Sequence, residues 1–135
     1  MKHFYAVTLF LTLLTSCTSM MISHRMKAAQ RKLLETRRLE QAGQWPEALA
    51  MSEKLHGSVA KSISSRPVRT GAGRVQVDLR PLLVAWETGP FAELQAALKK
   101  QNSNRTKTAL ISLRQQCVTC HTVLGKTEIQ LPEIQ

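Results

Sequence analysis

The chain has 135 residues and a formal net charge of +10, a length that suits one domain. Only 4% of its residues are aromatic, so the core must be built from Leu, Ala, Met and Val or completed by a bound group. The body of the chain contains no apolar stretch of the ~20 residues that a membrane-spanning helix needs.

The first 16 residues differ in character from the rest of the chain. A short basic start at Lys2-His3 precedes an apolar run, Phe4 to Leu14, that is broken only by threonines. This order is typical of a secretory signal, and the run is too short to span a bilayer. We therefore predict a signal peptide over residues 1–16.

The cysteine that follows this segment adds a second prediction. The stretch Leu14-Thr15-Ser16-Cys17 resembles the bacterial lipobox, in which the cysteine is acylated and becomes the new N-terminus. We expect Cys17 to carry a lipid, with residues 17–135 forming one domain in the periplasm. The alternative is an ordinary signal peptide followed by an incidental cysteine.

Export limits what the basic charge of the mature chain can mean. Charge alone would permit nucleic-acid binding, but an exported protein rarely meets nucleic acid, and we exclude that class. Acidic redox proteins and anionic lipid head groups are the better candidates. The alternative is that the charge only keeps the protein soluble.

Two helices are predicted in the first half of the mature chain. The first covers about residues 19–42 and ends at Gly43. The second starts at Trp45-Pro46-Glu47, where proline and an acid mark a first turn, and it stops before Pro67. Residues with helical spacing define one face of each: Ile22, Met26, Ala29 and Leu33, then Ala48, Met51, Leu55, Val59 and Ile63.

A linker rich in proline, glycine and arginine is predicted over residues 64–77, and only residues 75–79 hint at a strand. A third helical region begins near Asp78. Gly89-Pro90 interrupts it, and Pro90 opens a fresh segment.

The last helix is predicted from Arg105 to about Leu124, with Asn104 as the N-cap and Gly125 after its end. An extended or frayed tail follows over residues 127–135. Four helices with short connections predict an all-α fold, an antiparallel four-helix bundle. The last helix carries a regular apolar seam: Leu110, Leu113, Cys117, Cys120 and Leu124.

The sequence Cys117-Val118-Thr119-Cys120-His121 has the C-x-x-C-H spacing of covalent haem attachment. Residues three apart share one helical face, so both sulfurs can bond to one haem edge. His121 would be the proximal iron ligand. We predict one haem c per chain, bound through Cys117 and Cys120.

Three other interpretations of the motif are weaker. A redox dithiol of the thioredoxin kind needs a βαβ context, which this chain lacks. A zinc site needs about four ligands, and the spacing of His24 and His56 does not suggest one; we expect His56 at the surface. A disulfide between residues three apart on a helix would be strained.

The motif lies near the C-terminus, unlike in globular cytochromes of the mitochondrial type. The chain instead resembles the cytochrome c-prime family, the class II cytochromes c, over about residues 20–126. The residues that carry the resemblance are Met26-Lys27, Trp86, Phe91 and Leu113 to His121. Two positions depart from the family pattern, because Ile22 and Gly125 stand where basic residues are frequent.

The resemblance implies a four-helix bundle with haem on its last helix and a distal residue from the first. Met26 matches the distal position and would make the iron six-coordinate and suited to electron transfer. His24 is a competitor, about 200° away around the helix. A core role for Met26 is the other alternative, and it would leave a five-coordinate cytochrome that binds nitric oxide or carbon monoxide.

Our prediction from the sequence is thus a periplasmic, lipid-anchored electron-transfer protein and not an enzyme. Its expected partners are acidic redox proteins and, through the N-terminal lipid, a membrane; the resemblance also allows a homodimer. The arginines that could pair with the haem propionates are not distinguished by the sequence: Arg25, Arg66, Arg69, Arg74 and Arg80.

Overall fold

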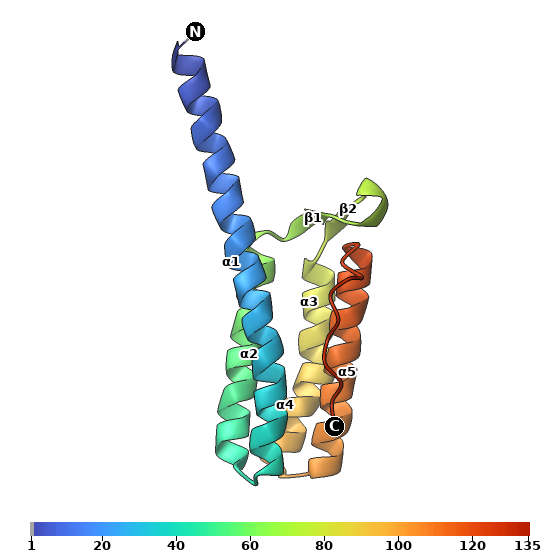
Figure 1. Ribbon diagram of the computed structural model, residues 1–135. Coiled ribbons are helices and arrows are strands. Elements are labelled where there is room, and N and C mark those ends of the chain that lie inside the picture. The colour runs from blue at the N-terminus through green and yellow to red at the C-terminus, as the bar shows by residue number, and fades with distance from the viewer. Residues whose placement is uncertain (1) are drawn as a thin grey trace.

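The computed structural model (Figure 1) describes the backbone of residues 2–135 and the side chains of residues 19–135. The lipidation predicted at Cys17 and the side chains of the predicted signal peptide lie outside that part. Helices dominate the described chain, and its one sheet has two short strands. The all-α prediction is confirmed. No helix among the described residues is long and apolar enough to cross a membrane.

The first two helices are α1 (Lys2–Gln41) and α2 (Trp45–Ser65), and they pack against each other. The turn between them depends on Gly43, whose φ of +72° favours glycine because it has no Cβ. The amide N–H groups of Gly43 and Gln44 donate to carbonyls of the last turn of α1 and so close that helix. Both predicted ends near this turn are confirmed.

The third helical region is divided as predicted. It consists of α3 (Arg80–Trp86), a widened turn (Glu87–Phe91) and α4 (Ala92–Lys99). Pro90 has no N–H to donate, and Gly89 leaves the helical conformation at φ −99° and ψ −106°. The chain direction is nevertheless kept, and Phe91 and Leu94 are buried beyond the interruption.

The predicted linker between α2 and α3 contains a β-hairpin, whose second strand lies within the strand hint at residues 75–79 and whose first strand was not predicted. Strand β1 (Val68–Thr70) pairs antiparallel with β2 (Gln76–Asp78), and Arg69 lies opposite Val77. The central residue of each strand is half-buried while its neighbours are exposed. The hairpin therefore has one face turned toward the helices, and that face carries Arg69.

The last helix, α5 (Ser103–Val123), begins two residues earlier than predicted. Its N-cap is Asn102, and the predicted cap at Asn104 is wrong. The side-chain oxygen of Asn102 accepts the backbone N–H of Arg105 at 3.0 Å. Gly125, at φ +68°, follows the end of the helix as predicted.

The C-terminal tail is extended and lies back along α5 (Figure 1). The Arg114 guanidinium donates to the carbonyl oxygens of Pro132 at 2.8 Å and of Leu131 at 2.9 Å. Ile134 is buried in the main core. Of the two predicted alternatives, extended and frayed, the tail therefore takes the extended form, fixed by these contacts.

The helices lie side by side, with the hairpin across one end (Figure 1). Helix α1 contacts α2 and α5, and α4 contacts α2 and α5. The core fills the space between them with aliphatic side chains from every helix except the short α3, whose Trp86 joins it. Its fully buried members include Ala48, Leu79, Leu94, Leu98, Leu110 and Leu113.

Candidate functional site

The C-x-x-C-H motif occupies the last two turns of α5, at the hairpin end of the molecule. The two cysteines are free thiols and both are half-buried. They continue the seam of Leu110 and Leu113, which are completely buried, and Cys120 packs against the main core. The structure therefore directs both sulfurs toward the interior, as the spacing predicted.

The environment keeps both thiols protonated. Burial raises the pKa of Cys117 to about 11, with a further contribution from Cys120 and a smaller opposing effect from the Trp86 indole. Burial also raises the pKa of Cys120, and the Arg69 guanidinium opposes it. A redox dithiol needs an attacking thiol with a lowered pKa, so these directions disfavour the thioredoxin-like interpretation.

His121 is half-buried, and burial lowers its pKa while Glu128 opposes that shift. The imidazole is therefore held in its neutral form, which has a nitrogen lone pair free for a metal. Its Nδ1 atom is buried and has no hydrogen-bond partner among the described residues. A buried polar atom without a partner is costly, and this one belongs to the predicted proximal ligand.

An aromatic cluster lies beside the thiols. The rings of Trp86 and Phe91 stack with centroids 5.0 Å apart, and His56 stacks on Phe91 at 5.0 Å. The side chain of His56 is 32% exposed, and its Nε2 atom is hydrogen-bonded to Glu87 at 2.7 Å. The indole N–H of Trp86 is buried near the Cys117 thiol.

The hairpin packs directly on the end of α5. A Cβ at Gly71 would lie 2.6 Å from the carbonyl oxygen of Val123 and 2.6 Å from a methyl carbon of Val77. Only glycine allows this approach. The sequence analysis missed this contact, because the signal of Gly71 is lost among the neighbouring linker glycines.

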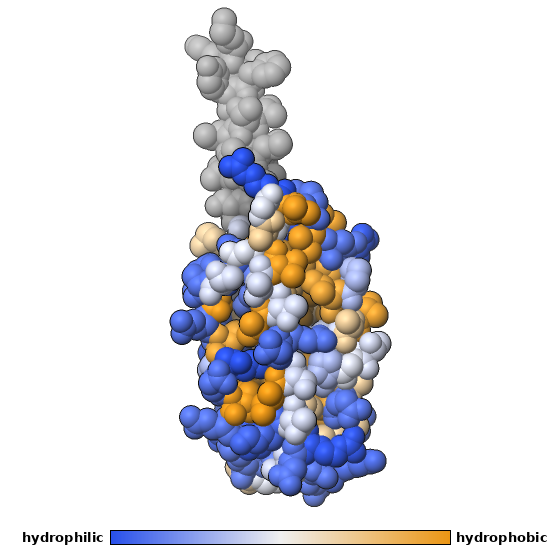
Figure 2. All heavy atoms as spheres, turned by 90° about the vertical axis from the view of Figure 1, so that its right-hand side faces the viewer, coloured by the Kyte–Doolittle hydropathy of each residue, from blue (hydrophilic) through white to orange (hydrophobic). Residues whose placement is uncertain are grey.

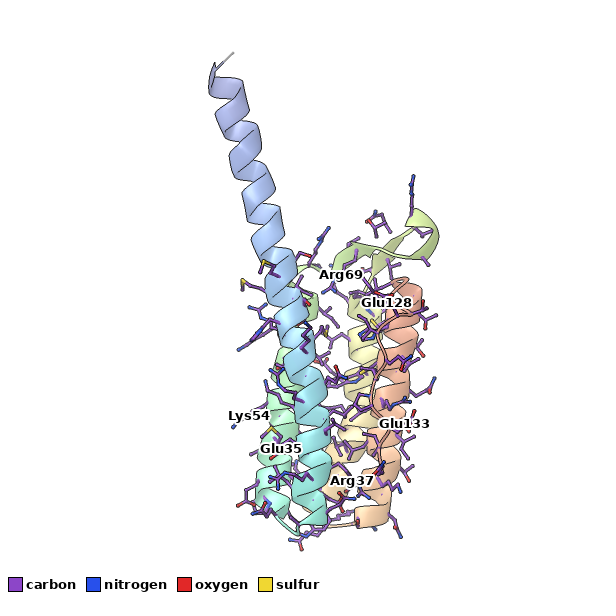
Figure 3. All side chains as sticks on the ribbon, in the orientation of Figure 1. Glu35, Arg37, Lys54, Arg69, Glu128 and Glu133 are labelled. Atoms are coloured by element: carbon purple, nitrogen blue, oxygen red, sulfur yellow. The ribbon has the colours of Figure 1, made fainter. Side chains whose placement is uncertain are left out.

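The structure separates the five candidate arginines. Arg80 is already paired with Asp78 at 2.7 Å, and Arg25 donates to the Ser65 hydroxyl at 2.9 Å. Arg69 is half-buried beneath the hairpin (Figure 3), and it has no carboxylate partner among the described residues.

The contacts of Arg69 leave part of its guanidinium unused. Its Nη2 donates to the carbonyl of Ser62 at 2.8 Å and its Nε donates to the carbonyl of Arg66 at 3.2 Å. Burial lowers its pKa, while its proximity to Cys120 acts in the opposite direction. Arg69 thus helps to cap α2 and also presents an unpaired positive charge beside the motif.

On α1 the structure places Met26 on the inward side, half-buried between Ile22 and Ala29, which are buried. His24 is exposed, as expected for a residue about 200° away. Met20 and Met21 are also exposed. Met26 is therefore the methionine of this segment that faces the helices, and its ligation of iron stays a prediction.

No protein-family model, curated protein or solved structure matches this chain. Among residues 19–135, no cluster of three or more histidine, cysteine, aspartate or glutamate side chains is arranged to hold a metal ion.

Proposed function

We propose that this protein is an exported mono-haem c-type cytochrome of the cytochrome c-prime kind that transfers electrons. One observation carries the proposal: two free, protonated thiols and a neutral imidazole, whose buried Nδ1 has no hydrogen-bond partner among the described residues, lie together in the last turns of α5. Covalent haem attachment uses these three groups in this spacing.

The residues around the motif fit such a group. Each thiol would add across one vinyl group, with the sulfur bonding to one carbon and its proton going to the next, so that no oxidant is needed. His121 would ligate the iron through its unprotonated nitrogen. Bound there, the haem supplies an iron that accepts and releases one electron.

The surrounding side chains would orient the group and exclude water. Leu113 and the aromatic pair of Trp86 and Phe91 offer an apolar wall. Arg69 offers its unpaired guanidinium to a carboxylate, and a half-buried ion pair of this kind fixes orientation as well as charge. Met26, on the inward side of α1, would be the distal ligand.

The finer features of the proposal follow from the same site. The helices would form an antiparallel four-helix bundle that holds the haem between α1 and α5. The chain would be periplasmic and anchored through lipid on Cys17, and its excess of basic residues would steer acidic redox partners. A homodimer stays a possibility that the family resemblance allows.

The test is export of the full chain in a bacterial host that attaches haem c. We expect a denaturing gel to retain haem on the chain, and the Cys117→Ala/Cys120→Ala variant to lose it. Thr119→Ala, an exposed position within the motif, is the matched control and should keep the haem. A wild-type chain without haem would refute the proposal.

Absorption spectra of the same preparation test the distal ligand. Six-coordinate iron with Met26 should give a low-spin reduced spectrum that carbon monoxide leaves unchanged. A high-spin reduced spectrum that responds to carbon monoxide or nitric oxide would identify a gas-binding protein and refute electron transfer through a methionine-ligated iron.

A further inference from the structure

The exposed apolar side chains gather at the hairpin end of the molecule. Of the nine large hydrophobic residues that are exposed among residues 19–135, six lie there, and Met20 and Val75 are 72% and 62% exposed. Figure 2 shows an apolar area at this upper end, bordered by strongly hydrophilic residues. The six come from α1, the hairpin, α5 and the tail: Met20, Met21, Val68, Val75, Val123 and Ile129.

The same end is the most basic part of the molecule. It comprises residues 19–27, 61–80 and 121–129, which contain eight basic and two acidic side chains. One of the two acids, Asp78, is already paired with Arg80. Exposed apolar groups mixed with unpaired basic groups are the composition that binds an anionic lipid surface.

A hollow between α1 and α2 at this end adds a specific feature. It is lined by Met21, Arg25, Lys61, Ser64 and Ser65. The Arg25 guanidinium is held by the Ser65 hydroxyl at 2.9 Å, and Lys61 is exposed. Two cations and the Ser64 hydroxyl around one open hollow match the chemistry of a phosphate group, and Met21 adds an apolar rim.

The course of α1 indicates that the phosphate belongs to a membrane lipid. The helix projects from the body at the hairpin end, beyond the hairpin itself (Figure 1). Cys17 precedes the first core residue, Ile22, by five positions, or about 8 Å of helix. A lipid on Cys17 would therefore place this end, and no other, at a bilayer surface.

We propose that the hairpin end docks on an anionic phospholipid bilayer, with Val75 and Met20 at the interface and the Arg25–Lys61 hollow on a lipid phosphate. This inference rests on the lipid anchorage proposed above and not on the haem. The orientation would hold the C-x-x-C-H end of α5 close to the membrane surface, so that electrons would be exchanged with a membrane-bound partner.

The experiment is hydrogen–deuterium exchange of the full lipidated chain reconstituted in two kinds of vesicle. One contains phosphatidylcholine with phosphatidylglycerol, and the other contains phosphatidylcholine alone. We expect slower exchange of the amides of residues 68–78 only on the anionic vesicles. The turn at residues 42–44, at the opposite end, is the internal control and should exchange equally on both.

Charge variants make the test specific. Lys61→Gln/Arg74→Gln removes two exposed cations that have no ion-pair partner within residues 19–135. Each basic residue near an anionic surface strengthens membrane binding about fivefold. The ratio of docked to undocked protein should therefore fall about 25-fold in this double variant. Lys99→Gln/Lys100→Gln removes the same charge from an exposed site on the opposite end and should leave the protection unchanged.

Three results would overturn the proposal. They are a hairpin that exchanges equally on both vesicles, protection produced equally well by inorganic phosphate, and protection by poly-glutamate but not by the anionic vesicles. The last result would indicate that the hairpin end binds an acidic protein and not a membrane. The mass of the N-terminal peptide reports the lipid and haem absorbance reports the haem, so a failure of the proposed function is recognised separately.

Discussion

The contact between the hairpin and α5 can be broken at one atom. In Gly71→Ala the new methyl carbon would lie 2.6 Å from two atoms, the Val123 carbonyl oxygen and a Val77 methyl carbon. An ordinary contact is at least 3.4 Å, so each overlap is about 0.8 Å. Overpacking of this kind costs about 1–3 kcal/mol of unfolding free energy. Because one neighbour is backbone, no side-chain rotation relieves it, and the hairpin must move away from the helix.

This movement should expose the thiols of the chain before haem attachment. With a pKa of about 11 in place of 9.0, Cys117 should react with a thiol reagent about 100-fold more slowly than a free cysteine at pH 8, since the thiolate is the reactive form. In Gly71→Ala the labelling rate should rise toward the free value. Urea unfolding followed by circular dichroism gives the stability change on the same sample, with Cys17 replaced by serine throughout.

Gly57→Ala is the control for this substitution. Gly57 lies inside α2, and a Cβ there would meet no atom within 4 Å. Alanine should raise the unfolding free energy by about 0.5–1 kcal/mol and leave the thiol labelling rate unchanged. A Gly71→Ala protein with wild-type stability and wild-type labelling would show that the hairpin does not rest on α5, and our account of the site would be wrong.

Three further outcomes test individual residues. Without haem, the raised pKa of Cys117 makes stability depend on pH, because the folded protein disfavours the thiolate. The unfolding free energy should be constant below about pH 9 and should fall by up to about 3 kcal/mol as the pH rises to about 11. Urea titrations measure this change. The haem-bearing form has no ionisable thiol and should lack this loss. Met26→Ala should yield a high-spin reduced spectrum that responds to carbon monoxide, while His24→Ala, at an exposed site, should not. Arg69→Gln should lower the reduction potential by roughly 20–60 mV, because a cation beside the site disfavours oxidised iron. The control, Arg74→Gln at the exposed hairpin turn, should change the potential less. Equal shifts in the two variants would contradict a special role for Arg69.

The helices were predictable because their signals are local. Gly43, Pro46 and Pro90 act on the backbone in their immediate neighbourhood, and apolar residues at helical spacing repeat over several turns. The N-cap of α5 was misplaced by two residues, since Asn102 and Asn104 are both good caps. Only the hydrogen bond from the Arg105 backbone N–H to the Asn102 side chain distinguishes them.

The hairpin and the environment of the thiols could not be predicted in the same way. Strands of three residues are too short to show alternation, and the segment around Arg69 contains the glycines and prolines of an irregular linker. The separation of Arg69 from Arg80 depends on the ion pair of Arg80 with Asp78. Arg69 differs from the other unpaired candidates in being half-buried beside Cys120, which is a property of the folded chain.

The hairpin therefore connects the two proposals made for this end of the molecule. Its strands hold Arg69 on the inward face, beside Cys120, and the turn between the strands carries Arg74 and Val75, which are exposed. One short hairpin can therefore contribute a charge to a haem site from its strands and a surface to a membrane from its turn. If both proposals hold, Gly71→Ala should weaken both functions together, because Gly71 fixes the hairpin on α5. Arg69→Gln should affect the haem potential alone, and Lys61→Gln/Arg74→Gln should act chiefly on the membrane contact.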